Sequence, residues 1–447
     1  MWLRGSQFNW PLWWLLFLLM SGCSQTPEQR ALERVKGLWP TVMAPYMQDA
    51  LWTPQWSYDA AHNLMLPMHC AFEACPGAPK AWRDDFDGFF LRFSAAFSVP
   101  LDDNSLREAQ FLYLASQYLV LSSGYSDQHG FHDQLYDQAL RAVLNAWRDR
   151  PAPHWAYSSD FPNMEKRLRW KLSPTRDQWS YFAAIIDEEY YLFATAADLA
   201  RVAAASGRAV DPAIRDILVL AREVFVQEGV FLPGNRWMMQ PGVWKDHKDY
   251  RFAGHAEVAE GLEPELVQGI GMDSSHAHRF PLWFRSLSAG SEALEIDAPY
   301  REMLEGFRNQ FTTHALVFPS KEYSWPVLNN YLSGHNGVYR YGYGTLGDSR
   351  GYGPYGLSYV LMQGWYPFLG GEELKAALIW LQESFPLPEE AVQFYLGPDT
   401  SRPRHPLVTS DAYYTKGMAE LQVNVGLLVA NYFSDSNKFD GTPCQDC

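Results

Sequence analysis

One short segment of this sequence concentrates an acid, a base and a cation, in the order Asp273-Ser274-Ser275-His276-Ala277-His278-Arg279. It directly precedes an apolar stretch, residues 280–287, whose pattern predicts a helix. Asp273 or Ser274 could cap that helix, but capping would account for only one residue of the segment. A carboxylate beside an imidazole suits general acid/base catalysis, so we expect Asp273 and His276 to be catalytic. We expect His278 and Arg279 to bind substrate.

A run of three acidic residues, Asp187, Glu188 and Glu189, lies among Ala, Ile, Tyr and Phe. Burying such a run is costly unless it faces a cleft. Hydrolysis of a glycosidic bond requires two carboxylates, which Asp273 and one member of this run could supply. Asp246 and Asp249 are further candidates. The alternative is a solvated helix face, because consecutive helical residues do not all point the same way.

A second polar segment, residues 329–341, carries amide, imidazole, phenol and guanidinium groups at Asn330, His335, Tyr339, Arg340 and Tyr341. A polysaccharide lyase must neutralise a uronate carboxylate, remove the C5 proton and protonate the leaving oxygen. These groups could share that work without paired carboxylates, with His335 and Tyr339 catalytic and the others binding substrate. The alternative is a glycine-rich aromatic loop that only packs on the fold.

Aromatic residues make up 15% of the chain, including 18 Trp and 25 Tyr. Rings beyond the needs of a core often stack on sugars, and burial in the core is the alternative for any one of them. We expect a glycan substrate, bound by residues that include Trp237, Trp244, His247 and Tyr352.

Several other classes of function are disfavoured. The sequence has no Gly-x-Ser-x-Gly elbow, phosphate loop, His-Glu-x-x-His motif or dinucleotide fingerprint. The net charge of −15 argues against nucleic acid as a partner. The histidines at 247, 255, 276 and 278 have no established spacing of metal ligands, so we predict neither a metal ion nor a cofactor.

Helical periodicity dominates the chain, which predicts about ten to twelve helices joined by loops rich in Gly, Pro and aromatic residues. The predicted helices are 81–97, 105–122, 131–148, 177–206, 212–227, 275–289, 298–313, 352–370, 372–384 and 412–433. Two long polar and aromatic stretches, 229–271 and 317–351, interrupt this pattern. Loops of this length inside a domain are usually functional, so we expect them to hold the site. No low-complexity linker divides the chain, so residues 55–447 are predicted to form one domain.

This pattern of helix pairs resembles the (α/α) toroids of six-hairpin glycoside hydrolases and polysaccharide lyases. Residues 334–343, followed by Gly351-Tyr-Gly-Pro-Tyr355, are similar to the elements that line the open end of such barrels. The resemblance covers most of the chain in architecture but only these two segments in sequence. It implies an all-α toroid with a few short strands and an enzyme that cleaves glycosidic bonds, by hydrolysis or by uronate elimination. A non-catalytic glycan-binding or envelope-scaffold protein is the alternative function, and an α-solenoid is the alternative fold.

The first 22 residues have the order of an export signal, with Arg4 before an apolar run, residues 10–20. Met20-Ser21-Gly22-Cys23 resembles the lipobox of bacterial lipoproteins, with Met20 where leucine is usual. The resemblance implies that Cys23 becomes the lipidated first residue and holds the protein to a membrane. Ser24 is not the aspartate of inner-membrane retention, which implies the outer membrane, with the protein facing the periplasm or the exterior. Residues 23–54 are then a tether and first helix.

Lipidation of Cys23 would leave four cysteines, Cys70, Cys75, Cys444 and Cys447. An even number in an exported protein predicts disulfides. Three pairings are open, among them the local one of Cys70 with Cys75 and Cys444 with Cys447. A site in which the four thiolates bind a metal is the alternative.

Overall fold

The computed structural model describes residues 25–102, 104–125, 129–153, 160–174, 181–321 and 323–434. The predicted signal segment, Cys23, Cys444 and Cys447 lie outside these ranges. Within them, no helix combines the length and the apolar character needed to cross a membrane.

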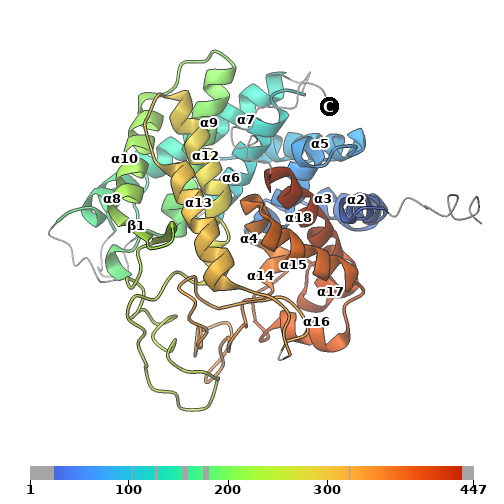
Figure 1. The fold of residues 1–447 in the computed structure, drawn as a ribbon. Helices are drawn as coiled ribbons and strands as arrows, with labels where there is room; N and C mark the ends of the chain where they lie inside the picture. Colours follow the sequence, from blue (N-terminus) through green and yellow to red (C-terminus); the bar gives the residue numbers. More distant parts are fainter. Residues whose placement is uncertain are drawn as a thin grey trace, which may run out of the picture.

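The predicted all-α fold is confirmed: helices dominate the described residues, and the named strands form two short antiparallel pairs (Figure 1). The strands are β1 (Gly229–Leu232) with β2 (Arg236–Met239), and β3 (Leu316–Val317) with β4 (Val327–Leu328). The α-helices are α2 (Pro27–Leu38), α3 (Ala44–Gln48), α4 (Ser57–His69), α5 (Lys80–Ala96), α6 (Ser105–Ser122), α7 (His129–Leu144), α8 (Met164–Lys171), α9 (Asp187–Ala205), α10 (Pro212–Glu228), α11 (Ser274–Ala277), α12 (Phe280–Ala293), α13 (Tyr300–Gln310), α14 (Val360–Gln363), α15 (Glu372–Glu383), α16 (Glu389–Leu396), α17 (Ser410–Thr415) and α18 (Met418–Ser434).

The central elements contact one another in a closed order. Helix α4 packs on α6, α6 on α9, α9 on α12, α12 on the short 3-10 helix η6 (Tyr366–Leu369), η6 on α18, and α18 on α4. A second set of helices lies against these: α2 and α15 on α18, α7 on α6, α10 on α9, and α13 on α12. In the described part of the chain these central elements thus form a closed ring of neighbours, and the second set packs against it.

The two long loop segments lie together at one end of the helices (Figure 1). Backbone hydrogen bonds join them: Val338 donates to His255 O at 3.1 Å and Arg340 to Asp249 O at 2.9 Å. An isolated β-bridge also pairs Asp273 with Tyr331. The loops therefore form one folded unit, which positions the residues between β2 and α14.

Four of the predicted helices are interrupted: 177–206 at residues 184–186, 275–289, 352–370, and 412–433 at residues 416–417. Residues 354–359 form turns, and regular helix begins only at Val360, because Pro354 disfavours helix and Tyr355 adopts a left-handed φ of 60°. The predicted helix 275–289 is divided into α11 and α12. The break is the turn at His278 and Arg279, so His276 lies in α11 whereas His278 lies in the turn that follows it.

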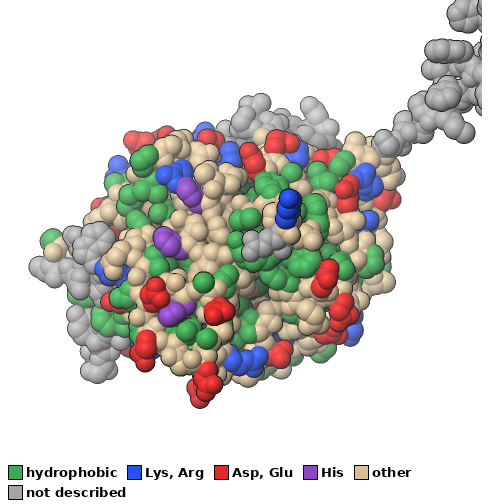
Figure 2. Space-filling view, turned by 60° about the horizontal axis from the view of Figure 1, so that its bottom comes forward, with side chains coloured by type: hydrophobic (Ala, Val, Ile, Leu, Met, Phe, Trp, Pro, Cys, Tyr) green, Lys and Arg blue, Asp and Glu red, His purple; other side chains and the backbone are tan. Residues whose placement is uncertain are grey.

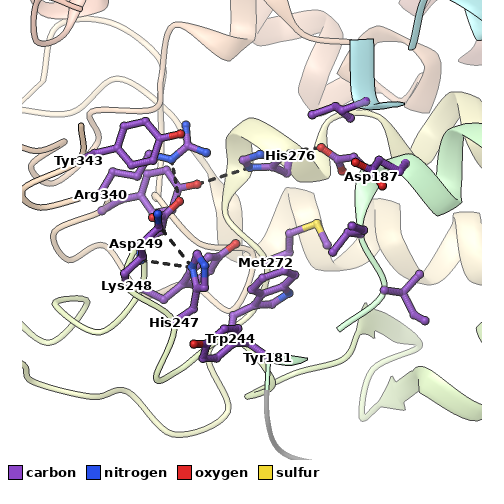
Figure 3. Close-up of a pocket in the computed structure, with 16 residues that line it drawn as sticks. Tyr181, Asp187, Trp244, His247, Lys248, Asp249, Met272, His276, Arg340 and Tyr343 are labelled. Atoms are coloured by element: carbon purple, nitrogen blue, oxygen red, sulfur yellow. Dashed lines mark hydrogen bonds and ion pairs between the residues drawn. The ribbon is translucent and has the colours of Figure 1, made fainter. Parts of the chain in front are cut away.

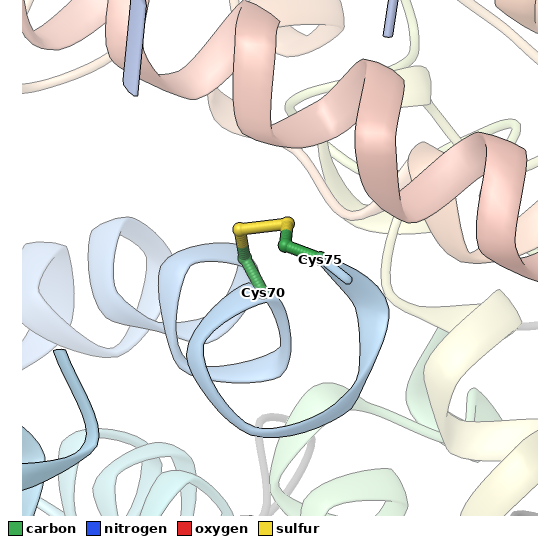
Figure 4. Close-up of a disulfide and its surroundings, with 2 residues drawn as sticks. All are labelled: Cys70 and Cys75. Atoms are coloured by element: carbon green, nitrogen blue, oxygen red, sulfur yellow. A yellow bond between two sulfur atoms is a disulfide. The ribbon is translucent and has the colours of Figure 1, made fainter. Parts of the chain in front are cut away.

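Cys70 and Cys75 form a disulfide, which is the local pairing of the alternatives open to these two residues (Figure 4). The bond spans the π-helical turn η2 (Cys70–Ala74), which continues α4. It therefore fixes the end of a central helix at the side of the molecule where α6 and α9 also end.

Candidate active site

A pocket of about 630 Å³ opens between the loop segments and the beginning of α9 (Figure 3). Figure 2 turns the loop end of the molecule towards the viewer and shows histidine side chains grouped on one half of this face. The residues that line the pocket are Leu106, Tyr181, Ile185, Ile186, Asp187, Glu188, Trp244, His247, Lys248, Asp249, Tyr250, Met272, His276, Tyr339, Arg340 and Tyr343.

Asp273 lies behind the pocket wall and has no exposed surface. Its carboxylate caps α11 by accepting from the backbone N of Ser275 at 3.1 Å and of His276 at 3.2 Å. It also accepts from His276 Nδ1 at 2.8 Å and from the Tyr250 hydroxyl at 2.6 Å. Burial alone would raise the pKa of this carboxyl, but the His276 imidazole and the hydrogen bonds outweigh burial and hold the pKa below its usual range. Asp273 is therefore an ionised, fixed group that does not line the pocket.

His276 connects this buried carboxylate to the pocket. Because Nδ1 faces Asp273, we assign the proton of the neutral imidazole to Nδ1, which leaves Nε2 as an acceptor. Nε2 lies 3.8 Å from Asp187 Oδ2, beyond hydrogen-bond distance, and a quarter of the side chain (24%) is exposed. The geometry thus presents a general base whose orientation is set by a buried carboxylate.

Tyr339 lines the same pocket from the second loop segment. Its backbone pairs with that of Tyr352, and its hydroxyl lies 3.5 Å from His276 Nδ1. Burial raises the pKa of the Tyr339 hydroxyl well above its usual value, although the Arg340 guanidinium opposes the shift. The phenol therefore stays protonated at neutral pH and can donate a proton.

Arg340 and Lys248 bring positive charge to the pocket. Arg340 adopts a left-handed φ of 55°, which is uncommon for a residue with a side chain. Its Nε donates to Asp249 Oδ2 at 2.9 Å, and its guanidinium lies 4.5 Å from the centre of the Tyr343 ring. The terminal nitrogens make no hydrogen bond with a side chain in the described part of the chain, so they can receive a substrate carboxylate.

Trp244 and His247 line the pocket, as the sequence predicts for substrate-binding residues. The Trp244 ring stacks on Tyr250 with 5.6 Å between the ring centres. Burial lowers the pKa of His247, which favours a neutral imidazole there.

The acidic run is divided between the pocket and the interior. Asp187 lines the pocket and pairs with Arg279, which lies behind it. Glu188 also lines the pocket and pairs with Arg167 at 3.1 Å. Glu189 has no exposed surface and is held between Arg167 and Lys171, so the prediction that it is catalytic is wrong: it cannot reach a substrate.

Four residues expected to bind substrate are buried and do not line the pocket, and one of them is Arg279, which pairs with Asp187 from behind. Trp237 has no exposed surface and packs among the phenylalanines of α10 and α12, so it cannot stack on a sugar. His278 is buried, and its Nδ1 accepts from the backbone N of Trp365 at 2.9 Å. Asn330 is also buried, and its amide donates to Gly337 O at 2.9 Å and to Gly353 O at 2.8 Å. Asn330 holds the loop together instead of contacting a ligand.

Three more expected site residues do not line the pocket. His335 is exposed and contacts Ser333. The Tyr341 hydroxyl donates to Ala259 O at 2.9 Å. Tyr352 supports Tyr339 through the backbone.

Tyr250, Lys248 and Tyr343 also line the pocket, although their sequence positions did not predict them as site residues. Tyr250 both donates to the Asp273 carboxylate and accepts from the Asp273 backbone N at 3.2 Å. Tyr250 is the last residue of the polar and aromatic segment 244–250. The composition of that segment indicated the region of the site but did not single out Tyr250.

Among the described residues, no group of three or more His, Cys, Asp or Glu side chains is arranged to hold a metal ion. Comparisons of the chain with protein-family models, with curated proteins and with solved structures give no match.

Proposed function

We propose that this protein is a polysaccharide lyase that cleaves a uronate-containing glycan by β-elimination. One observation carries the proposal: the imidazole of His276, oriented by the buried Asp273, faces a pocket that also holds Tyr339 and two cations. This set contains a base, an acid and a receptor for a carboxylate, which are the three groups that elimination needs.

In the proposed reaction, Arg340 and Lys248 bind the uronate carboxylate and stabilise the negative charge that develops when the C5 proton leaves. Nε2 of His276 takes that proton. The electron pair of the C5–H bond forms the C4=C5 double bond, and the C4–O bond breaks. The Tyr339 hydroxyl protonates the leaving oxygen, so no water is consumed.

After one turnover Nε2 of His276 has gained a proton and the Tyr339 hydroxyl has lost one. Nε2 releases its proton to solvent once product leaves, and the Tyr339 phenolate takes up one proton from solvent. Nδ1 keeps its proton, which faces Asp273, throughout, so both side chains return to their starting states.

Hydrolysis, the first expectation from the sequence, is less well supported. It needs one carboxyl group that is protonated before it donates. Each carboxylate on the pocket wall pairs with an arginine: Asp187 with Arg279, Glu188 with Arg167, and Asp249 with Arg340. Each of these carboxylates is thus already engaged by a guanidinium, an arrangement that suits a stabilising group better than a general acid.

A product assay distinguishes the two reactions. The purified chain is incubated with uronate polymers (polygalacturonate, alginate and a glycosaminoglycan) and with a neutral glycan. We expect new reducing ends from one uronate polymer, each accompanied by the ultraviolet absorbance of a double bond conjugated to the carboxylate. Reducing ends without that absorbance would establish hydrolysis, and no cleavage of any polymer would contradict the proposal.

Variants test the assigned roles. His276→Ala and Tyr339→Phe should each reduce kcat by roughly 10²- to 10⁴-fold, as removal of a general acid or base does. His335→Ala and Tyr341→Phe are matched controls from the same loop, because neither residue lines the pocket, and both should keep the wild-type rate.

The proposal includes the architecture and location expected from the sequence: an (α/α) toroid held to the bacterial outer membrane by lipid on Cys23. The closed order of central helices supports the toroid. Fractionation of cells that express Cys23→Ala tests the anchor, because loss of the acyl chains should move the protein from the membrane to the soluble fraction.

A further inference from the structure

A second pocket, of about 430 Å³, lies at the other end of the central helices. The candidate active site includes Asp187 and Glu188 at the beginning of α9, whereas the second pocket includes Arg201 and Ala205 at its end. The remaining walls come from η2 and the turn after it, from Arg83 of α5, from the end of α6 with the residues that follow it, and from Tyr432 near the end of α18. The two pockets are therefore separated by the length of a central helix.

The charge in this pocket contrasts with that of the chain. The protein carries a net charge of −15, but the pocket is lined by two arginines, Arg83 and Arg201, and by one carboxylate, Glu73. Glu73 already pairs with His69 Nδ1 at 2.7 Å. Arg83 has no ion-pair partner among the described residues; its guanidinium lies 4.6 Å from the centre of the Tyr125 ring. The pocket thus offers an unneutralised cation to an anionic ligand.

Flat apolar surface adjoins this charge. Tyr125 is 46% exposed, which is high for an aromatic residue beside a pocket, while Phe72 and Tyr432 form a buried apolar wall. The C–H face of a sugar ring packs on surfaces of this kind. The disulfide at Cys75 fixes one rim, so the pocket is preformed.

We infer that this second pocket binds a small carboxylated sugar, with Arg83 pairing with the carboxylate and Tyr125 stacking on the ring. Its volume lies within the range of about 300–1,000 Å³ that is typical of small-molecule sites. A guanidinium matches a carboxylate with two parallel hydrogen bonds, and the exposed ring selects a cyclic ligand over a bare anion. Binding here does not depend on the lyase chemistry proposed for the first pocket.

Calorimetric titration of the full chain tests this inference with three probes: glucuronate, glucose and inorganic phosphate. We expect glucuronate to bind, and Arg83→Gln and Tyr125→Ala each to weaken that binding at least about tenfold, the loss of roughly 1.4 kcal/mol. Because the first pocket is proposed to bind uronate as well, each of these titrations is carried out in the Arg340→Gln background, which removes that carboxylate receptor and should leave binding at the second pocket in place. Lys80→Gln is the matched control, because Lys80 lies on the same helix as Arg83 but outside the pocket.

The alternative results would each overturn the inference. These are no glucuronate binding, equal binding of glucose, phosphate binding without glucuronate binding, or glucuronate binding that survives both Arg83→Gln and Tyr125→Ala. If Arg83→Gln does not fold, Arg83→Lys takes its place in the test. Lysine keeps the positive charge but lacks the two parallel donors of the guanidinium, so glucuronate should bind this variant more weakly than the wild type. The titration requires no turnover, so its failure is distinguishable from failure of the lyase proposal.

Discussion

Glu189 and Asp273 are both carboxylates without exposed surface, but their partners differ in kind. Glu189 accepts from Arg167 Nε at 2.9 Å and from Lys171 Nζ at 2.9 Å, two cations that are themselves buried. Asp273 accepts from a phenol, from backbone amides and from one imidazole. Two of the partners of Asp273, the imidazole of His276 and the ring of Tyr250, also line the first pocket, whereas Arg167 and Lys171 do not.

The pKa of the carboxyl group is lowered in both networks, so the direction of the shift does not separate structure from function. For Glu189, burial raises the pKa, but Lys171 and Arg167 outweigh it. For Asp273, burial raises the pKa, but the His276 imidazole and the hydrogen bonds outweigh it. The two networks differ in whether a partner of the buried carboxylate can gain or lose a proton while it contacts a ligand.

The largest expected effect is that of Asp273→Asn. The amide keeps the size of the side chain but no longer selects the imidazole with a proton on Nδ1. We expect kcat on the preferred uronate polymer to fall by roughly 10³- to 10⁴-fold, as in other enzymes with a carboxylate-oriented histidine. Asp246→Asn, an exposed position outside the pocket, should keep the wild-type rate. If the rate of Asp273→Asn stayed within a factor of three of the wild-type rate, the proposed role of the Asp273 network in catalysis would be wrong.

Glu189→Gln should give the opposite result. Loss of the charge leaves Lys171 buried without its carboxylate, which should lower the free energy of unfolding by about 4 kcal/mol. Activity per folded molecule should change little, because Glu189 does not line the pocket. Urea denaturation measures the first quantity and active-site titration the second. Glu165→Gln, which breaks the surface pair with Arg169, is the control and should cost less than about 1 kcal/mol.

Asp198 sharpens the comparison, because it is a buried carboxylate with neutral hydrogen-bond donors. Oδ2 accepts from Ser116 Oγ at 2.6 Å and from Gln117 Nε2 at 2.8 Å. Burial raises the pKa of this carboxyl to about 6, although these hydrogen bonds oppose the shift. Its network joins α6, α9 and α12 in the middle of the central helices, away from the first pocket.

This raised pKa predicts a dependence of stability on pH. Between the ordinary pKa of an aspartate and a pKa of about 6, the folded protein binds more protons than the unfolded chain, so stability falls as pH rises through that window. The difference should amount to roughly 3 kcal/mol. Urea denaturation from pH 4 to pH 7.5 should show this slope in the wild type and its loss in Asp198→Asn. If Asp198→Asn showed the same slope as the wild type, the dependence of stability on pH would come from other titratable groups.

Helical periodicity predicted elements such as α6, α10 and α13 well, because each depends on local spacing of apolar residues. The site was predicted in part. Trp237 and Trp244 both come from the aromatic stretch after α10, but only Trp244 lines the pocket, and Trp237 packs against α12. That distinction depends on contacts between distant segments, which the spacing of residues does not encode.

The segment 273–279 was also predicted only in part. Its residue types indicated that acidic and basic groups lie together there, but not which of these groups lines the pocket. Asp273 turns inward because it caps α11, and His276 faces the pocket from the first turn of that helix. The partner that completes the network, Tyr250, is 23 residues away and carries no local pattern.

Tyr250→Phe should have the smallest effect. The hydroxyl donates to Asp273 Oδ2, the oxygen that His276 Nδ1 also contacts, so its removal should cost about tenfold in kcat, or roughly 1 kcal/mol for one hydrogen bond. Steady-state kinetics on active-site-titrated protein measures this loss, with urea denaturation of the same variant beside it. A merely structural role for Tyr250 would lower the free energy of unfolding and leave kcat per folded molecule unchanged, and that result would place Tyr250 with the packing residues instead of the Asp273 network.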